Sequence, residues 1–327
     1  MLSASEVIPW VLFVLLCLVF LAGCGFFVLY FLARKAFHII FDRPQPLPAY
    51  DRSPTEINQD TIYGRGQNWF YSNRLDFEDV KMTSYDGLSL AAYYLPAKEA
   101  DTKRLVILIH GWKDVPANMA AFAQMYLEKM DCHILIVHMR THGMSEGRYI
   151  GYGLSESQDI LMWTALMEER LPGPLNTIYH GFSMGAATAL IAAGSRRLPR
   201  SVVGLIADSP YDSFENLVGH LIRKRYRFAP RIFLRLISHF STMYIGYTMR
   251  QISPAALAKQ IEVPVLLIHG TADTFIPPHM SEVIYNRLQS PKRIFLVQDA
   301  EHVMSYDIAP SSYSAEVDQF LQYCGIV

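Results

Sequence analysis

The sequence predicts an α/β fold in which a mostly parallel sheet is covered by helices on both faces. From about residue 75 onward, short apolar runs alternate with longer segments of helical character, as in strands joined by helical crossovers. Most of the strand-like runs are apolar at every position, so both faces of each strand should be buried. With 327 residues, 51% of them hydrophobic, the chain can form one large core with an appendage.

Charge and cysteine content exclude some classes of protein. The formal net charge is -1, which gives no reason to expect a nucleic-acid partner. Cys17 and Cys24 lie in an apolar run, so the four cysteines indicate neither a disulfide framework nor a metal site. The histidines at 138, 142 and 180 share no ligand spacing. We therefore expect no cofactor and no metal.

Residues 1–41 are predicted to be a transmembrane anchor. No charged residue occurs from Val7 to Ala33, and a helix of that length exceeds the roughly 30 Å hydrocarbon core of a bilayer. A cleaved secretory signal is the competing interpretation, but Glu6 precedes the run, no Lys or Arg does, and the run is too long. The segment is therefore expected to stay in the membrane as a single span.

The sequence of this anchor bears on lipidation and on its orientation in the membrane. Residues 21–24, Leu-Ala-Gly-Cys, resemble the lipobox of bacterial lipoproteins, but a basic start is missing and the apolar run continues past the cysteine. The positive charges of Arg34, Lys35 and Arg43 lie on the C-terminal side of the run. By the positive-inside rule they place the rest of the protein in the cytoplasm.

Residues 42–74 are predicted to be a Pro-rich linker and a segment preceding the domain. Four prolines between Asp42 and Pro54 indicate a stiff, extended spacer. Residues 56–73 mix polar with aromatic side chains, and we expect them to pack against the domain rather than form one.

The domain itself is predicted to cover residues 75–327. An Asp-Gly turn at Asp86 and Gly87 joins the first two of eight expected strands into a hairpin. The expected strands are 77–83, 88–95, 105–109, 134–137, 177–179, 202–207, 265–268 and 294–297. The expected helices are 117–129, 154–171, 184–195, 280–288 and 312–323. The interval between the sixth and seventh strands exceeds one crossover, which indicates a cap at about 210–255.

The stretch from Thr177 to Ala193 carries the strongest chemical signal. A strand-like run ends at Gly181, Ser183 follows, and a second glycine, Gly185, opens a helix of small residues. This Gly-x-Ser-x-Gly elbow should hold the serine in a strained, exposed conformation from which its hydroxyl can act as a nucleophile. The alternative role for Ser183 is a simple helix N-cap, in which case both glycines would be coincidental.

Polar residues follow five of the expected strands directly. Because ligands of open parallel sheets bind beyond the carboxyl ends of the strands, these residues could share one cleft. They are His110-Gly111-Trp112, Ser183, Asp208-Ser209-Pro210, His269 to Asp273, and Gln298 to His302. The order Ser, Asp, His along the chain is the one that α/β-hydrolases use.

With these residues in view, the sequence from about Leu75 to the C-terminus resembles the α/β-hydrolase superfamily. Within it, the chain is most similar to bacterial serine hydrolases tethered by an N-terminal membrane helix, a branch related to prolyl-oligopeptidase-type and acyltransferase or thioesterase-type domains. The matching pieces are Ser84 to Leu88, His110 to Trp112, His142 to Gly147, Gly181 to Gly185, His269 to Asp273 with Ile276-Pro277, and Glu301-His302.

The resemblance implies a role for each of several residues. Ser183 would be the nucleophile, His302 the general base and then acid, and Asp273 the carboxylate that fixes the imidazole tautomer. The backbone N–H groups of Trp112 and Met184 would form the oxyanion hole. An unassisted serine hydroxyl is almost wholly protonated at neutral pH, so it needs such a base.

Some alternatives and one departure from the family pattern stay open. Asp208 is a rival for Asp273, because some hydrolases take their acid from the sixth strand, and His279 is a distant substitute for His302. His110 and His269 are interpreted as structural turn residues. Where relatives usually have Asp-x-Arg-Gly, residues 138–141 read His-Met-Arg-Thr, which puts substrate contacts of that loop in doubt.

The predicted cap is strongly cationic. No acidic residue occurs from Asn216 to Arg250, and the spacing of Arg231, Arg235 and His239 suits one face of an amphipathic helix. This segment is either an ordinary solvated cap or a surface that touches anionic lipid or admits an anionic substrate such as an acyl-CoA.

Taken together, these patterns predict a membrane-tethered serine hydrolase that cleaves a carboxylic ester. Its partners would be a small-molecule acyl ester or lipid-like substrate and the membrane. Peptide and thioester cleavage use the same triad and remain open, as does a catalytically silent hydrolase fold that serves as a binding module.

Overall fold

The computed structural model describes residues 4–43, 60–226 and 231–327, and the chain divides into two compact units. The smaller unit comprises residues 1–42 and 218–248, and the larger unit comprises residues 43–217 and 249–327. The Pro-rich stretch predicted as a linker falls almost wholly within residues 44–59, outside the described residues, as does Arg227 of the cationic segment.

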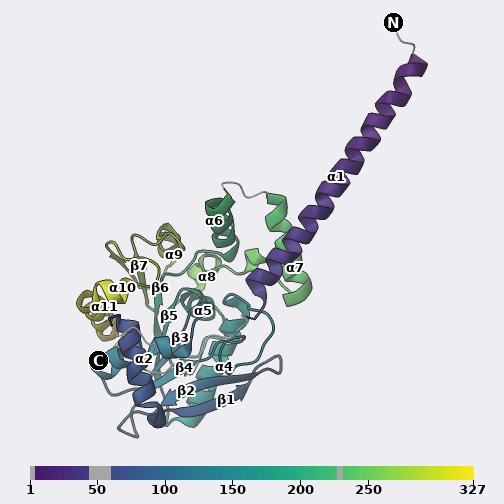
Figure 1. The fold of residues 1–327 in the computed structure, drawn as a ribbon. Helices are drawn as coiled ribbons and strands as arrows, with labels where there is room; N and C mark the ends of the chain where they lie inside the picture. The colour runs from purple at the N-terminus through teal and green to yellow at the C-terminus, as the bar shows by residue number, and fades with distance from the viewer. Residues whose placement is uncertain (1–3, 44–59, 227–230) are drawn as a thin grey trace. The chain divides into compact units, whose positions relative to one another are not determined.

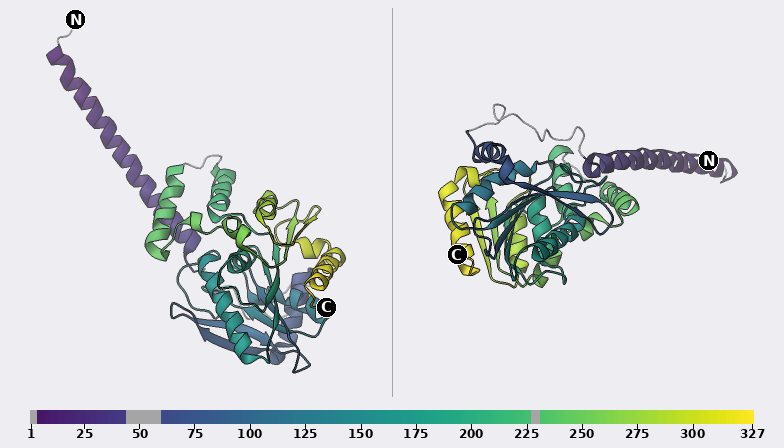
Figure 2. Two further views of the ribbon diagram at one scale, coloured as in Figure 1. Left: turned by 180° about the vertical axis from the view of Figure 1, so that it is seen from behind. Right: turned by 90° about the horizontal axis from the view of Figure 1, so that it is seen from below.

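The larger unit is built on one eight-stranded sheet with helices on both of its faces (Figure 1, Figure 2). The strand order is β1-β2-β4-β3-β5-β6-β7-β8, and only the β1–β2 and β2–β4 pairs are antiparallel. The strands are β1 (Glu78–Thr83), β2 (Ser89–Leu95), β3 (Arg104–Ile109), β4 (His133–Val137), β5 (Asn176–Phe182), β6 (Val202–Asp208), β7 (Val265–Gly270) and β8 (Lys292–Val297). The predicted fold class is confirmed.

Two helical layers enclose this sheet. Side chains of α2 (Ile62–Ser72), α3 (Ala120–Leu127) and α11 (Pro310–Tyr323) share one apolar core with the sheet. Helix α4 (Leu154–Arg170) packs beside α5 (Met184–Ala193), which in turn packs on β5 and β6. The part of this unit that the structure describes also contains α8 (Pro254–Leu257), α9 (His279–Arg287) and α10 (Ser305–Ile308), and a short 3-10 turn, η3 (Pro116–Met119), precedes α3.

Two details differ from the sequence prediction. The strand predicted at 294–297 is not buried on both faces: in β8, Leu296 is 40% exposed, because β8 pairs with β7 alone and forms an edge of the sheet. The stretch 62–72 forms α2, a helix that the residue pattern did not indicate. This helix does pack against the larger unit, as expected of residues 56–73.

The smaller unit contains α1 (Ala4–Phe41), most of α6 (Phe214–Tyr226), and α7 (Arg231–Ile245). Among the described residues, α1 is the one helix long and apolar enough to cross a membrane. Its residues from Ile8 to Val28 are exposed on every side, whereas Ala33 and Phe37 farther along are buried. Helix α7 forms over the segment predicted to be an amphipathic helix and packs against α1 through Phe240.

Candidate active site

The turn between β5 and α5 forms the predicted elbow. A Cβ on Gly181 would lie 2.4 Å from the backbone of Gly185, and a Cβ on Gly185 would lie 2.0 Å from the carbonyl oxygen of Ile109 in β3. Neither position can therefore carry a side chain. Ser183 lies between them with φ 55° and ψ −119°, a conformation that costs an L-residue roughly 1–3 kcal/mol.

The hydroxyl of Ser183 does not cap the helix that follows it. Its side chain makes no capping hydrogen bond to α5, and instead lies 3.0 Å from Nε2 of His302. The serine is strained as predicted but not exposed, since only 7% of its surface is accessible. One reason is the loop after β3: a Cβ at Gly111 would lie 3.4 Å from the Cβ of Ser183.

His302 connects the serine hydroxyl to a buried carboxylate. Nδ1 of His302 lies 2.6 Å from Oδ2 of Asp273, and the Asp273 side chain is fully buried. A carboxylate can only accept, so Nδ1 carries the proton, and Nε2 is left to accept from the Ser183 hydroxyl. The structure thus brings Ser183, His302 and Asp273 into one hydrogen-bonded chain.

The environment of Asp273 keeps this carboxylate ionised. Burial pushes its pKa upward, but hydrogen bonds from His269, from His302 and from the backbone N–H of Ile276 outweigh burial and hold the pKa far below its ordinary value. Oδ1 accepts from the N–H groups of Phe275 and Ile276 at 2.9 and 2.8 Å. The negative charge that orients His302 is therefore present across the physiological pH range.

His269 supports Asp273 from behind. Its Nε2 lies 2.8 Å from the carbonyl oxygen of Ile276 and 3.2 Å from Oδ2 of Asp273, and its Nδ1 lies 2.6 Å from the Ser281 hydroxyl. The imidazole is fully buried at the end of β7, so it holds the turn that carries Asp273 rather than facing a substrate. This role agrees with the interpretation of His269 as a turn residue, although the residue pattern did not reveal its contact with Asp273.

Asp208, the rival acid at the end of β6, has a different partner. Its Oδ1 accepts from the hydroxyl of Ser209 at 2.8 Å, and burial raises its pKa to about 6 against the opposing effect of that hydrogen bond. The backbone of Asp208 has a separate task, because its carbonyl oxygen accepts from the Ser183 N–H at 2.7 Å. The side chain of His302 is hydrogen bonded to Asp273 instead.

The loop after β3 carries Trp112, one of the two expected backbone donors. Two histidine rings hold this loop: Nδ1 of His110 bonds the Gly111 carbonyl oxygen at 2.8 Å, and Nε2 of His142 accepts from the Lys113 N–H at 3.0 Å. Burial lowers the pKa of His142 to about 4, so its ring stays neutral and can accept. The other expected donor, the Met184 N–H, opens α5, where the first N–H groups have no partner within the helix.

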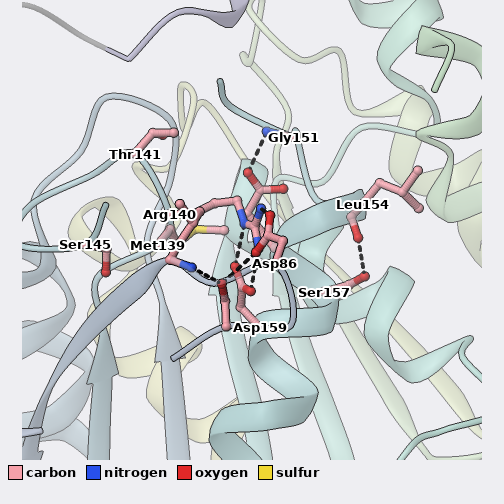
Figure 3. Close-up of polar contacts among 12 residues, drawn as sticks. Asp86, Met139, Arg140, Thr141, Ser145, Gly151, Leu154, Ser157 and Asp159 are labelled. Atoms are coloured by element: carbon pink, nitrogen blue, oxygen red, sulfur yellow. Dashed lines mark hydrogen bonds and ion pairs between the residues drawn. The ribbon is translucent and has the colours of Figure 1, made fainter. Parts of the chain in front are cut away.

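Arg140, in the loop that departs from the family pattern, is buried in an ion-pair network (Figure 3). Its guanidinium binds both oxygens of Asp159 at 2.7 Å, and both oxygens of Asp86 at 2.9 and 3.1 Å. The arginine therefore ties the β1–β2 turn to α4. At position 140 of this loop, the side chain is held by two carboxylates of the protein and therefore has a structural role.

Comparisons with known proteins agree with this architecture. A family model for acetyl xylan esterases matches residues 170–320. The uncharacterized protein YqkD of Bacillus subtilis is 30% identical over 250 residues, which cover 75% of this chain and 81% of YqkD. The uncharacterized protein YfhR of Escherichia coli K12 is 26% identical over 233 residues, 70% of this chain and 74% of YfhR.

Among solved structures, an esterase of Pyrococcus furiosus superposes with a TM-score of 0.64 at 18% identity, covering 87% of this chain and 98% of the esterase. An acylaminoacyl peptidase of Pyrococcus horikoshii gives a TM-score of 0.55 at 19% identity, covering 77% of this chain and 43% of the peptidase. At these identities the structures establish the fold alone.

The chain belongs to the α/β-hydrolase superfamily, as its resemblance implied, and to the same family as YqkD. Within the superfamily, its matches lie among esterase-like and peptidase-like hydrolases.

The Arg140 network generates a prediction about stability. Arg140→Met leaves Asp159 buried without its partner, which typically costs about 3–5 kcal/mol, and we expect the melting temperature in detergent to fall by roughly 10 °C. Burial already raises the pKa of Asp159 to about 6. Without the arginine the pKa rises further, so folding must neutralise a carboxylate that is charged when unfolded, and the loss should be larger at pH 8 than at pH 5.

The control for this prediction is Arg148→Met. Arg148 is exposed and lies near the same loop, with its guanidinium over the ring of Tyr149. It should change the melting temperature by no more than about 2 °C. Equal losses in the two variants would contradict the structural role of Arg140.

Proposed function

We propose that the protein is a serine hydrolase that cleaves a carboxylic ester through an acyl-enzyme intermediate. The observation that carries the proposal is the hydrogen-bonded chain from Ser183 through His302 to the buried carboxylate of Asp273. Three side chains from the ends of different strands meet there with the donor and acceptor order that nucleophilic catalysis needs. A catalytically silent binding module would have no need of that order.

In the first half of the reaction, Ser183 attacks the ester carbonyl carbon while Nε2 of His302 takes the hydroxyl proton. Asp273 stabilises the imidazolium that forms, and the N–H groups of Trp112 and Met184 bind the developing oxyanion. Each such donor is typically worth about 3 kcal/mol of barrier. His302 then gives its proton to the departing alcohol.

In the second half, a water attacks the acyl-enzyme with His302 as base, and the carboxylic acid leaves as Ser183 is restored. Every proton passes through one imidazole, so the scheme uses no metal and no cofactor. Support for an ester as substrate comes from the acetyl xylan esterase family model and from the esterase fold of the Pyrococcus furiosus protein. A peptide or acyl thioester is the second candidate class, because the acylaminoacyl peptidase shares the fold.

The proposal includes a place for the protein in the cell. Helix α1 would be a single-pass anchor, with the hydrolase domain (75–327) following the segment 42–74. Arg34 and Lys35 in the C-terminal part of α1 and Arg43 just after it favour the cytoplasmic side for that domain. The substrate would then be a small acyl ester or lipid-like molecule that reaches the inner face of the membrane.

The triad makes a prediction for active-site labelling. A fluorophosphonate probe should label the purified wild-type protein in detergent, and Ser183→Ala and His302→Ala should abolish labelling, since one removes the nucleophile and the other its base. Asp273→Asn should slow labelling by about 10⁴-fold, because the wrong imidazole tautomer is favoured. The readout is in-gel fluorescence against time, followed by screening of nitrophenyl esters alongside peptide and thioester substrates.

Two matched controls test the assignment. Ser209 follows β6 as Ser183 follows β5, and also has φ 55°, so Ser209→Ala should keep labelling within about tenfold of wild type. Asp208→Asn should behave likewise if Asp273 is the functional acid. A folded wild-type protein that is not labelled, or an Asp208 variant more impaired than the Asp273 variant, would overturn the assignment.

Membrane sidedness gives a separate prediction. When the chain is produced in a bacterial host with an epitope at its C-terminus, we expect it to stay in the membrane after a carbonate wash. The epitope should resist protease in intact spheroplasts and be digested in inverted vesicles. Digestion in intact spheroplasts would place the hydrolase domain outside the cytoplasm.

A further inference from the structure

The first inference concerns the smaller unit and rests on the proposal that α1 crosses a membrane. Rings along α1 meet rings along α7 in the same order: Tyr30 lies 5.0 Å from Phe240, and Phe37 lies 5.1 Å from Tyr244. The two helices therefore run in the same direction. The first residues of α7, Arg231 and its neighbours, precede Phe240 by nine positions, about 13 Å of helix.

This register places the start of α7 near one end of the exposed part of α1. The stretch of α1 that is exposed on all sides runs from Ile8 to Val28 and is about 30 Å long, the thickness of a bilayer's hydrocarbon core. Phe240 lies beside α1 between Tyr30 and Phe37. Counting back along α7 brings Arg231 level with about residue 24 of α1, in the last turn or so of that exposed stretch and close to the depth of the lipid headgroups.

Helix α6 lies beside α7 and ends at the same level. A Cβ at Gly219 of α6 would lie 3.7 Å from Leu234 of α7, and α6 ends at Tyr226 just before α7 begins at Arg231. Figure 1 shows these two ends directed along α1 toward its N-terminal half. The exposed side chains at the two ends are Arg223, Lys224, Arg225, Tyr226, Arg231 and Ile232.

The chemistry of this hairpin tip suits one occupant. Its charged groups are all positive, and no acidic residue occurs between 216 and 250. Tyr226 is 69% exposed and Ile232 is 47% exposed, so aromatic and aliphatic side chains stand among the basic ones. Basic groups that bind anionic headgroups, with apolar groups that enter the acyl boundary, are typical of an interfacial membrane contact.

We propose that the hairpin tip, residues 223–226 and 231–232, rests in the anionic headgroup layer of the leaflet from which α1 emerges. The protein would then hold its membrane by two contacts: the spanning helix and this basic tip. The anchor alone allows the smaller unit to tilt, whereas a second contact sets its orientation to the bilayer.

Trypsin provides the test, because the tip contains its own cleavage sites. The full chain is incorporated into nanodiscs of phosphatidylcholine with or without phosphatidylglycerol, and cleavage is followed by mass spectrometry. We expect cleavage after Arg223 and Arg231 to be at least about tenfold slower in the anionic discs. Cleavage after Arg196 and Arg197, exposed in the larger unit, serves as the internal control and should not change.

A variant pair sharpens this test. Arg235→Gln removes one exposed charge of α7 without removing either cleavage site and should weaken the protection, whereas Arg250→Gln in the larger unit should not. Equal cleavage in both kinds of disc would overturn the proposal, as would protection by an acyl-CoA in detergent without lipid. Failure of the chain to enter discs would instead refute the anchor.

A second, independent observation concerns α2 and the loop that carries His302. The hydroxyl of Tyr63 donates to the carbonyl oxygen of Val303 at 2.5 Å, and the Ile62 N–H donates to Asp307 at 2.6 Å. Val303 has φ 62°, a strained value for a β-branched residue, which persists only where its surroundings hold it. The backbone immediately after His302 is therefore fixed by the first turn of α2.

Helix α2 is itself firmly seated. A Cβ at Gly66 would lie 2.4 Å from the backbone of Ala121, so α2 and α3 are in close backbone contact. The Tyr63 ring lies 6.4 Å from that of Phe182, the residue before Ser183. Burial, and then the nearby carboxylates of Asp208 and Asp114, raise the pKa of Tyr63 well above its ordinary value, so its hydroxyl remains a donor.

We infer that Tyr63 is a positioning residue for His302, acting through the Val303 carbonyl oxygen. This inference deepens the proposed function and rests on it. Tyr63→Phe keeps the ring and removes only the hydroxyl. We expect the rate of fluorophosphonate labelling and kcat to fall by about tenfold with KM unchanged, because the base is displaced while the substrate still binds.

The matched control is Tyr126→Phe. Tyr126 is a fully buried tyrosine whose hydroxyl lies 3.0 Å from Nδ1 of His180, away from the triad. Both variants lose one buried hydrogen bond and should lower the melting temperature by similar amounts, but only Tyr63→Phe should lower kcat. Wild-type kcat in Tyr63→Phe, or an equal fall in both variants, would overturn the inference. If the folded wild-type protein is not labelled at all, the proposed function is refuted instead.

Discussion

The close approach of α5 to β3 is the constraint on which the site depends. Gly185 lies so near the carbonyl oxygen of Ile109 that no side chain fits between them, and this contact forces the chain to turn within one residue at the end of β5. Ser183 therefore takes a positive φ that an isolated chain would avoid. The strain of roughly 1–3 kcal/mol is offset by the fully buried strands and helix on either side. The hydroxyl thereby reaches His302 instead of capping its own helix.

A second constraint is electrostatic, because a buried carboxylate must have partners. Asp273 lies in the interior and stays ionised because two imidazoles and two backbone N–H groups donate to it. His269 adds to this set from the end of the same strand, four residues earlier, so one turn contains both the acid and one of its supports. Asp208 shows the contrast: it is equally buried, its side-chain donors are the hydroxyls of Ser209 and Tyr313 rather than imidazoles, and its pKa rises to about 6. Burial alone raises the pKa of a carboxyl group and favours its neutral form. The number and kind of hydrogen-bond donors determine whether Asp273 or Asp208 keeps its charge.

The residue pattern allowed most of the fold to be predicted, for a physical reason. The central strands could be predicted because they are apolar on both faces, and this pattern survives in a linear sequence. The first two strands were predicted from the Asp-Gly turn between them. The residues that make up the hydrogen-bonded chain were among those that follow a strand, and the resemblance to α/β-hydrolases singled them out from the others. Helix α2 was missed because Gly64 and Gly66 lower its helical propensity, and its stability comes from packing on α3. The contact of Arg140 with Asp86 and that of Tyr63 with Val303 join segments more than fifty residues apart, and no local pattern encodes such contacts.

The roles of helices α1, α2 and α7, which lie outside the alternation of strands and helices, are the hardest to predict from sequence. Helix α2 packs on the core of the larger unit, and its first turn holds the backbone beside His302. Helix α1 belongs to the other unit, where its aromatic side chains meet those of α7. Composition alone allowed two roles for the cationic segment 216–250, a solvated cap or a surface that binds lipid, because a charge pattern does not identify the group that the charges face. The ring contacts supply the missing information, since they align the basic start of α7 with the last turns of the exposed part of α1. Among the described residues, α1 is the one helix long and apolar enough to cross a bilayer. The basic residues at the start of α7 indicate a lipid partner because they lie beside the exposed apolar surface of α1.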